Sequence, residues 1–139
     1  MEKQRGFLKD YTDRLIEKGK CFPNIGLWDG KMGIAVYLLH LARITGEENY
    51  ERQADEFMDT VYEQLAERIS IFYGDGLLGI GCGIEYMIEH GFIEGDSDEI
   101  LAEIDIVARN IVDRRPIESL PLQDGVQLEI GRASCRERV

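Results

Sequence analysis

Three aspartates occupy equivalent places in a repeated motif and could supply carboxylates for acid–base chemistry. Asp29 opens the run DGKMGI, Asp75 opens DGLLGI 46 residues later, and Asp124 opens a third copy, DGV, after a further 49 residues. A carboxylate in such a place can transfer a proton, or it can cap a helix by accepting a hydrogen bond from a backbone N–H group. From the residues alone, capping is the role that we favour for each of them.

The cysteines and histidines do not form a metal-ligand pattern. Cys21, Cys82 and Cys135 make no CxxC pair and no zinc-finger spacing. We expect Cys82 to be a small buried side chain, because free cysteine is among the most buried residue types. His40 could face the interior of a toroid, but we favour a hydrogen-bonded core residue. We expect His90 to be a favourable partner of the C-terminal end of a helix rather than an acid or base. We therefore predict no metal site among these residues.

Apolar residues at helical spacing predict an all-α protein. The expected helices span residues 2–18, 31–45, 49–66 and 77–89. A fifth helix follows a variant capping box formed by Asp96 and Glu99. Residues 31–45 and 77–89 are apolar on nearly every side, which is typical of buried helices. The order of helices is therefore outer, inner, outer, inner, outer, followed by the start of a third inner helix.

The first helix and the connections carry further expectations. The apolar face of the first helix consists of Phe7, Leu8, Tyr11 and Leu15. Residues 19–29 are interpreted as a connection in which Asp29 caps the next helix. Trp28 could line the mouth of a toroid or anchor the loop to the core, and we favour the second role. Residues 68–74 are interpreted as an extended link.

Glycines at the start of each inner helix predict close packing. A glycine inside a helix costs about 1 kcal/mol relative to alanine, so Gly79, Gly81 and Gly83 within one turn require a neighbour that approaches the backbone. The repeat spacing is typical of stacked helical pairs. If all inner helices run the same way, the pairs form an α/α toroid with the glycine turns at one end, where the helix N-termini give a positive field.

Charge and composition limit the partners. The 139 residues carry a formal net charge of −11, which argues against nucleic acid or an anionic membrane as a partner. The N-terminus is polar and no apolar stretch is long enough to span a bilayer, so we expect neither a signal peptide nor a membrane span. The expected location is the cytoplasm.

The last eleven residues differ from the rest of the chain. Residues 129–139 contain three arginines, have no helical periodicity, and interrupt the third repeat where its helix should begin. One allowed back-translation of this segment resembles a common sequencing-adapter oligonucleotide. We interpret 129–139 as a non-native tail. One domain is then expected over residues 1–128.

Three stretches together resemble the lanthionine synthetase C-like (LanC-like) family. They are GLWDGKMGIA at 26–35, ARITGEENY at 42–50 and DGLLGIGCGIEY at 75–86. The likeness runs from about Gly26 to Gly125. It is greatest with a bacterial branch in which the second repeat is followed by a segment such as GFIEGD at 91–96.

The resemblance implies a toroid of about seven helical pairs and a zinc ion held by two cysteines and a histidine. In family members that cyclise peptides, the zinc activates a substrate cysteine thiolate, which adds to dehydroalanine or dehydrobutyrine and forms a thioether. The resemblance also implies a dehydrated precursor peptide or a dehydratase as partner. It makes Asp29, Asp75 and Asp124 candidate catalytic residues, because they would lie at the end of the toroid where the family's site lies.

The zinc ligands of the family have no counterpart here. In the family the second cysteine directly precedes the histidine, whereas Cys21 precedes Phe22 and Cys82 precedes Gly83. The chain is therefore expected to be an N-terminal fragment with about two and a half helical pairs, without activity of its own, and with zinc only in the full-length protein. Two alternatives are a carbohydrate-active α/α toroid, which needs paired carboxylates, and a non-catalytic peptide-binding scaffold.

Overall fold

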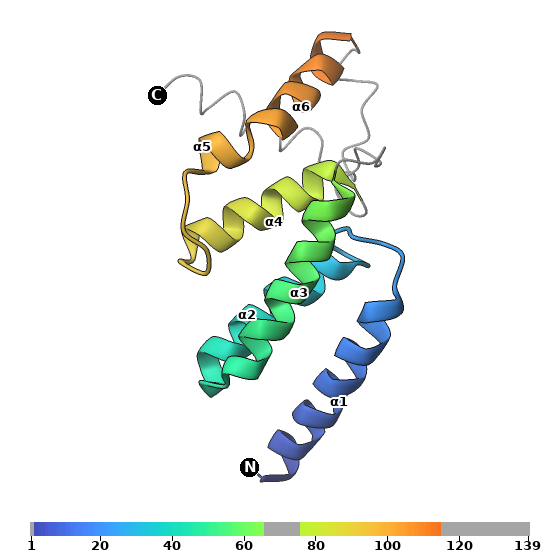
Figure 1. Ribbon diagram of the computed structural model, residues 1–139, viewed down its shortest axis with the longest axis vertical. Coiled ribbons are helices and arrows are strands. Elements are labelled where there is room, and N and C mark those ends of the chain that lie inside the picture. The colour runs from blue at the N-terminus through green and yellow to red at the C-terminus, as the bar shows by residue number, and fades with distance from the viewer. Residues whose placement is uncertain (1, 66–75, 115–139) are drawn as a thin grey trace.

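All regular secondary structure in the part of the chain that the structure describes is helical, and no strand occurs there. A computed structural model describes residues 2–65 and 76–114 (Figure 1). Its helices are α1 (Glu2–Cys21), α2 (Lys31–Thr45), α3 (Glu48–Gln64), α4 (Leu77–Glu89), α5 (Ser97–Ile100) and α6 (Ala102–Arg114). The all-α prediction is confirmed, and the predicted bounds of α2 and α4 agree with the structure.

Helices α2 and α3 form an antiparallel hairpin that holds much of the core. Gly46 ends α2 in the left-handed conformation, with φ of 72°, and its N–H donates to the carbonyl of Ala42. The sequence of α3 predicts an apolar stripe at helical spacing, formed by Tyr50, Ala54, Phe57, Met58, Val61, Tyr62 and Leu65. The stripe is buried from Tyr50 to Val61, whereas Tyr62 is 43% exposed and Leu65 is half-buried. It packs on α2, whose Met32, Ala35 and Leu38 have no exposed surface. The hairpin is therefore held together mainly by apolar burial.

Helix α4 lies beside α2 and runs in the same direction (Figure 1). Met32 near the start of α2 lies beside Gly83 of α4, and His40 further along α2 bonds Tyr86. Near the end of α2, Arg43 donates to the carbonyl of His90. Contacts whose residue numbers rise together on both helices show parallel packing. The glycine turns that open α2 and α4 therefore lie at the same end of the pair.

Helix α1 packs through a different face from the one predicted. Phe7 and Tyr11 of the predicted apolar face are 74% and 52% exposed, and Leu8 is exposed too. The buried positions are Thr12 and Gly19. The Thr12 hydroxyl donates to the carbonyl of Leu8 and shares a 2.8 Å hydrogen bond with the Tyr37 hydroxyl of α2. Small residues let α1 approach α2, and Ile16 packs against the core, whereas Phe7, Leu8 and Tyr11 remain exposed.

Helix α1 also extends to Cys21, three residues beyond the predicted end. The predicted connection began at Gly19, but Gly19 lies within the helix. A side-chain carbon at this position would meet Ile34 of α2 at 2.7 Å and Phe57 of α3 at 3.0 Å. Gly19 is thus a packing residue rather than a helix stop.

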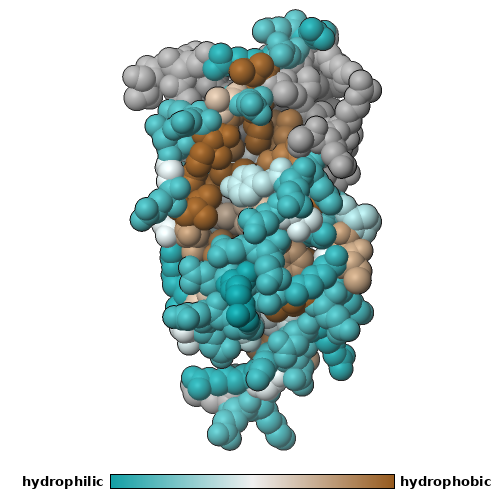
Figure 2. Space-filling model, viewed as in Figure 1, coloured by the Kyte–Doolittle hydropathy of each residue, from teal (hydrophilic) through white to brown (hydrophobic). Residues whose placement is uncertain are grey.

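The fifth predicted helix is divided in two. The Asp96 side chain accepts a hydrogen bond from the N–H of Asp98, so Asp96 is the predicted N-cap. The chain then leaves helical geometry at Leu101, which is fully buried and separates α5 from α6. The side chains of α4, α5 and α6 enclose a cavity of about 410 Å³ with the end of α3. Figure 2 shows apolar surface over this upper part of the molecule.

Several predictions lie outside the described residues. These are the link at 68–74, the third motif copy at 124–126, the domain end at 128 and the tail at 129–139. No helix within 2–65 or 76–114 is both long and apolar enough to cross a membrane.

Candidate functional site

The loop before α2 occupies the N-terminal end of that helix. The N–H of Lys31 donates to the carbonyl of Asn24 at 3.1 Å, and the N–H of Met32 donates to the carbonyl of Ile25 at 3.3 Å. The Asn24 side chain in turn accepts from the N–H of Gly26. These amides would otherwise be free to bind an anion. The expected positive field at the start of α2 is therefore directed into the protein's own loop.

Asp29 does not cap α2, so that prediction is wrong. The N-cap position belongs to Gly30, and no side chain caps the helix there. Asp29 is exposed, because the loop carbonyls already bind the amides that a capping carboxylate would bind. Trp28 beside it is 65% exposed, so the prediction that it anchors the loop to the core is also wrong. Both side chains face outward next to the glycine turn.

The glycines of the first motif make room for this loop. A side-chain carbon at Gly30 would come within 3.0 Å of backbone atoms of Asn24 and Gly26, and one at Gly33 would clash with the Leu27 carbonyl. A backbone neighbour cannot turn aside as a flexible side chain can. The GxxG spacing of the first copy therefore lets the preceding loop lie directly on the helix.

The two motif copies adopt the same backbone geometry at the helix start. Gly30 has φ of −145° and ψ of −175°, and Gly76 has φ of −130° and ψ of −162°. The N–H of Ile34 donates to Gly30 at 3.3 Å, and the N–H of Ile80 donates to Gly76 at 3.2 Å. The repeat seen in the sequence is thus also a structural repeat.

Gly83 provides the close contact that the glycine-rich start of α4 predicts. A side-chain carbon there would lie 2.6 Å from the Met32 Cε atom and 3.4 Å from the Leu27 side chain. Met32 has no exposed surface, so α2 and α4 touch through this position. Leu27 connects the same contact to the loop before α2.

The three candidate aspartates cannot be compared with one another. Asp29 is the one that the structure describes, while Asp75 and Asp124 lie outside the described residues. Asp29 lies at the end of the α2–α4 pair where both helices begin. Within the described part of the chain, no second candidate aspartate lies beside it.

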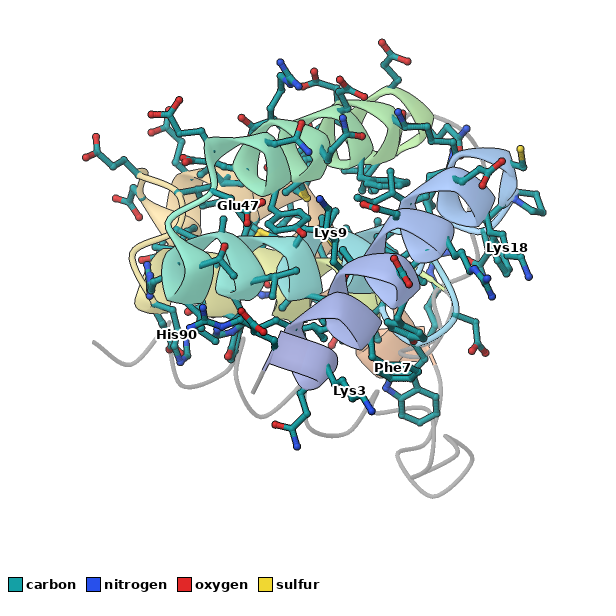
Figure 3. The ribbon with its side chains drawn as sticks, turned by 90° about the horizontal axis from the view of Figure 1, so that it is seen from below. Lys3, Phe7, Lys9, Lys18, Glu47 and His90 are labelled. Carbon is teal, nitrogen blue, oxygen red and sulfur yellow. The ribbon has the colours of Figure 1, made fainter. Side chains whose placement is uncertain are left out.

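A cluster of aromatic and imidazole rings lies at the opposite end of the pair. The His40 Nε2 atom is 2.6 Å from the Tyr86 hydroxyl, and the Tyr86 ring stacks on His90 with centroids 3.9 Å apart. The Arg43 guanidinium lies 3.8 Å from the centre of the Phe92 ring. Figure 3 shows His90 on the far side of the molecule from Lys18. Such contacts fasten the C-terminal ends of α2 and α4.

The prediction that His40 is a hydrogen-bonded residue is confirmed, although it is only partly buried. His90 ends α4, as predicted, and its Nδ1 atom is 2.8 Å from the carbonyl of Tyr86. The sequence reasoning missed Tyr86 as the partner of His40. The signal was present, since these two residues are 46 apart, as are the motif copies.

The described residues contain no group of three His, Cys, Asp or Glu side chains that could hold a metal ion. Cys21 is exposed at the end of α1. Cys82 is partly exposed in α4, so it is less buried than predicted. These two thiols do not fit a zinc site of the kind that the LanC-like resemblance implies.

Comparisons with protein-family models, with curated proteins and with solved structures gave no match to this chain. The function is therefore inferred from the residues and from their arrangement.

Proposed function

We propose that this chain is the N-terminal part of a LanC-like protein, an incomplete α/α toroid whose full-length form joins peptide thiols to dehydrated residues as thioethers. The observation that carries the proposal is the parallel packing of α2 and α4 with equivalent glycine turns at one end. A toroid of helical pairs needs inner helices that all run in this way. The proposed chemistry comes from the motif resemblance. The parallel packing of α2 and α4 supports the proposed toroid.

The exposed apolar surface of the second repeat also supports an incomplete array. The pocket beside α4 is lined by apolar side chains, of which Ile84 and Ile104 are already buried and Leu77 is half-buried. Ile100 and Tyr62 at its edge are 38% and 43% exposed. In a stacked array, each pair buries such a face against the next pair. A further helical pair against α4 would complete this burial.

In this proposal the chain contributes structure, and the thioether chemistry belongs to the complete protein. Cys21 and Cys82, the cysteines within the described residues, do not fit a zinc site, so no catalytic step is assigned to them. In the proposed toroid, the chain forms part of the end at which the inner helices begin, and Asp29 is exposed at this end. We propose that the chain alone is inactive, that a dehydrated peptide is the substrate of the complete protein, and that a dehydratase can be its partner.

The test begins with the rest of the gene. We expect a later cysteine followed, some tens of residues on, by a Cys-His pair. The full-length protein should then bind zinc and form thioethers on a dehydrated peptide, whereas the present chain should do neither. A complete gene that lacks these residues, or a zinc-loaded full-length protein without thioether formation, would contradict the proposed activity.

A second experiment tests the fragment interpretation separately. Purified alone, the chain should aggregate or melt at low temperature, because the open flank of α4 has no neighbour. Analytical ultracentrifugation and thermal denaturation measure these properties. A monomer with a sharp two-state transition would show that the described helices form a finished domain.

A further inference from the structure

Lys31 is the charged residue that is buried within the described part of the chain, and no contact there explains its burial. It is the first residue of α2, and only 8% of its surface is exposed. Its backbone N–H bonds the loop, but its ammonium group has no hydrogen-bond or ion-pair partner among the residues of 2–65 and 76–114. Lysine is almost never buried to this degree without a partner, because the loss of hydration is costly.

The Lys31 side chain lines a pocket of about 250 Å³ between α1, α2 and α3. The other lining residues are Lys20 of α1 and Glu56, Phe57 and Thr60 of α3. The pocket lies where Gly19 lets α1 approach the α2–α3 hairpin. A single buried water needs only about 10–15 Å³ of such space, so the pocket has room for a larger occupant.

Among the described residues that line the pocket, the charges sum to one positive charge without a counter-charge. Lys20 and Glu56 are paired at 3.4 Å, and both side chains are about half exposed. The Thr60 hydroxyl already donates to the backbone carbonyl of Glu56 at 3.2 Å. Within residues 2–65 and 76–114, the ammonium of Lys31 is therefore the lining donor that is still available for an occupant. This local excess stands out in a chain whose net charge is −11.

One wall of the pocket is apolar. Phe57 belongs to the core and is only 3% exposed, yet its ring borders the pocket. A ligand that fits the pocket would have one negative charge, which pairs with the Lys31 ammonium, and a short apolar part, which packs on Phe57. Phosphate fits less well, because it carries more than one charge at neutral pH and has no apolar part.

We propose that this pocket binds a small organic monocarboxylate, whose carboxylate accepts hydrogen bonds from the Lys31 ammonium. The ion pair would be largely removed from solvent, where charge-assisted hydrogen bonds are stronger than at the surface. The site lies between α1 and the hairpin, where Lys31 follows Gly30 of the first glycine turn, and it is separate from the ring cluster. It does not depend on the LanC-like assignment.

Propionate is a suitable probe, and propionamide is its uncharged analogue of similar shape. We would titrate each into the isotopically labelled full chain at constant ionic strength and follow backbone amide shifts by NMR. Propionate should shift the amides of Lys31 and Thr60 in a saturable way, and propionamide should not. Equal binding of both compounds would overturn the proposal, because the ammonium would then contribute nothing.

Substitutions test the assigned residue. Lys31→Met keeps the length of the side chain and removes the charge, so it should weaken propionate binding about tenfold or more. Lys3→Met is the matched control, since Lys3 is exposed and points outward from α1 (Figure 3), and it should change binding by less than about twofold. Unchanged affinity in Lys31→Met overturns the proposal.

Lys31→Gln is a second variant in case the methionine disturbs folding, and circular dichroism checks the helix content of both. Inorganic phosphate provides a further arm of the titration. If phosphate binds in a Lys31-dependent way and propionate does not, the carboxylate assignment is wrong. If neither anion produces saturable shifts, the pocket holds only water and the proposal fails.

Discussion

Replacing Gly33 by alanine tests whether the GxxG motif exists to accept the loop before α2. In an ordinary exposed helix this change stabilises the protein, because alanine is favoured over glycine by about 1 kcal/mol. At Gly33 the added carbon would clash with the backbone carbonyl of Leu27. The loop must therefore move away from the helix, so the substitution should destabilise the protein.

The structure gives the size of the effect. If the loop lifts away, the hydrogen bonds from Lys31 and Met32 to the loop carbonyls are lost, at about 1 kcal/mol each. Ile25, which is 5% exposed, would also lose its burial, worth about 2 kcal/mol. After the favourable helix term is subtracted, Gly33→Ala should lower the free energy of unfolding by about 3 kcal/mol, and by less if the loop shifts only slightly.

Urea denaturation in the cold, followed by far-ultraviolet circular dichroism, measures this change, provided that the m-value stays constant. Gly6→Ala is the matched control, because nothing lies within 4 Å of a carbon added at Gly6 on exposed α1. It should raise stability by about 0.5–1 kcal/mol. If Gly33→Ala stabilises the chain as Gly6→Ala does, the loop does not pack on the helix as described.

Two further predictions concern tyrosines. Tyr86→Phe removes the 2.6 Å hydrogen bond to His40 and should lower the free energy of unfolding by about 1 kcal/mol; an unchanged urea midpoint would show that the pair contributes nothing. Burial, followed by the negative charges of Glu47 and Asp13, raises the pKa of Tyr50 above its ordinary value of 10.0. The folded state therefore holds this proton more tightly than the unfolded state, so the stabilisation is complete below pH of about 10 and is lost as pH rises through the raised pKa. Denaturation curves across that range should decline less steeply for Tyr50→Phe, and parallel curves for the two proteins would refute this.

The helices of the core could be predicted because their sequences are dominated by local periodicity. The bounds predicted for α2 and α4 agree with the structure, and the buried stripe of α3 runs from Tyr50 to Val61 as expected. The repeated glycine starts were also visible, and both adopt the same backbone geometry. The role of Asp29 at the start of α2 could not be predicted from the sequence, because either the loop carbonyls or the Asp29 carboxylate could bind the first amides of the helix. The structure shows that the loop carbonyls bind them.

The amino-acid sequence by itself determined the helical class, the repeat and the residues at which α2 and α4 begin, because helix formation and glycine spacing are local properties. The tertiary structure decided which surfaces meet. It buried Thr12 and Gly19 of α1 in place of the larger apolar face, joined His40 to Tyr86, and enclosed the Lys31 side chain. Each of these depends on the shape of a partner distant in sequence, and periodicity along one helix carries no information about that partner.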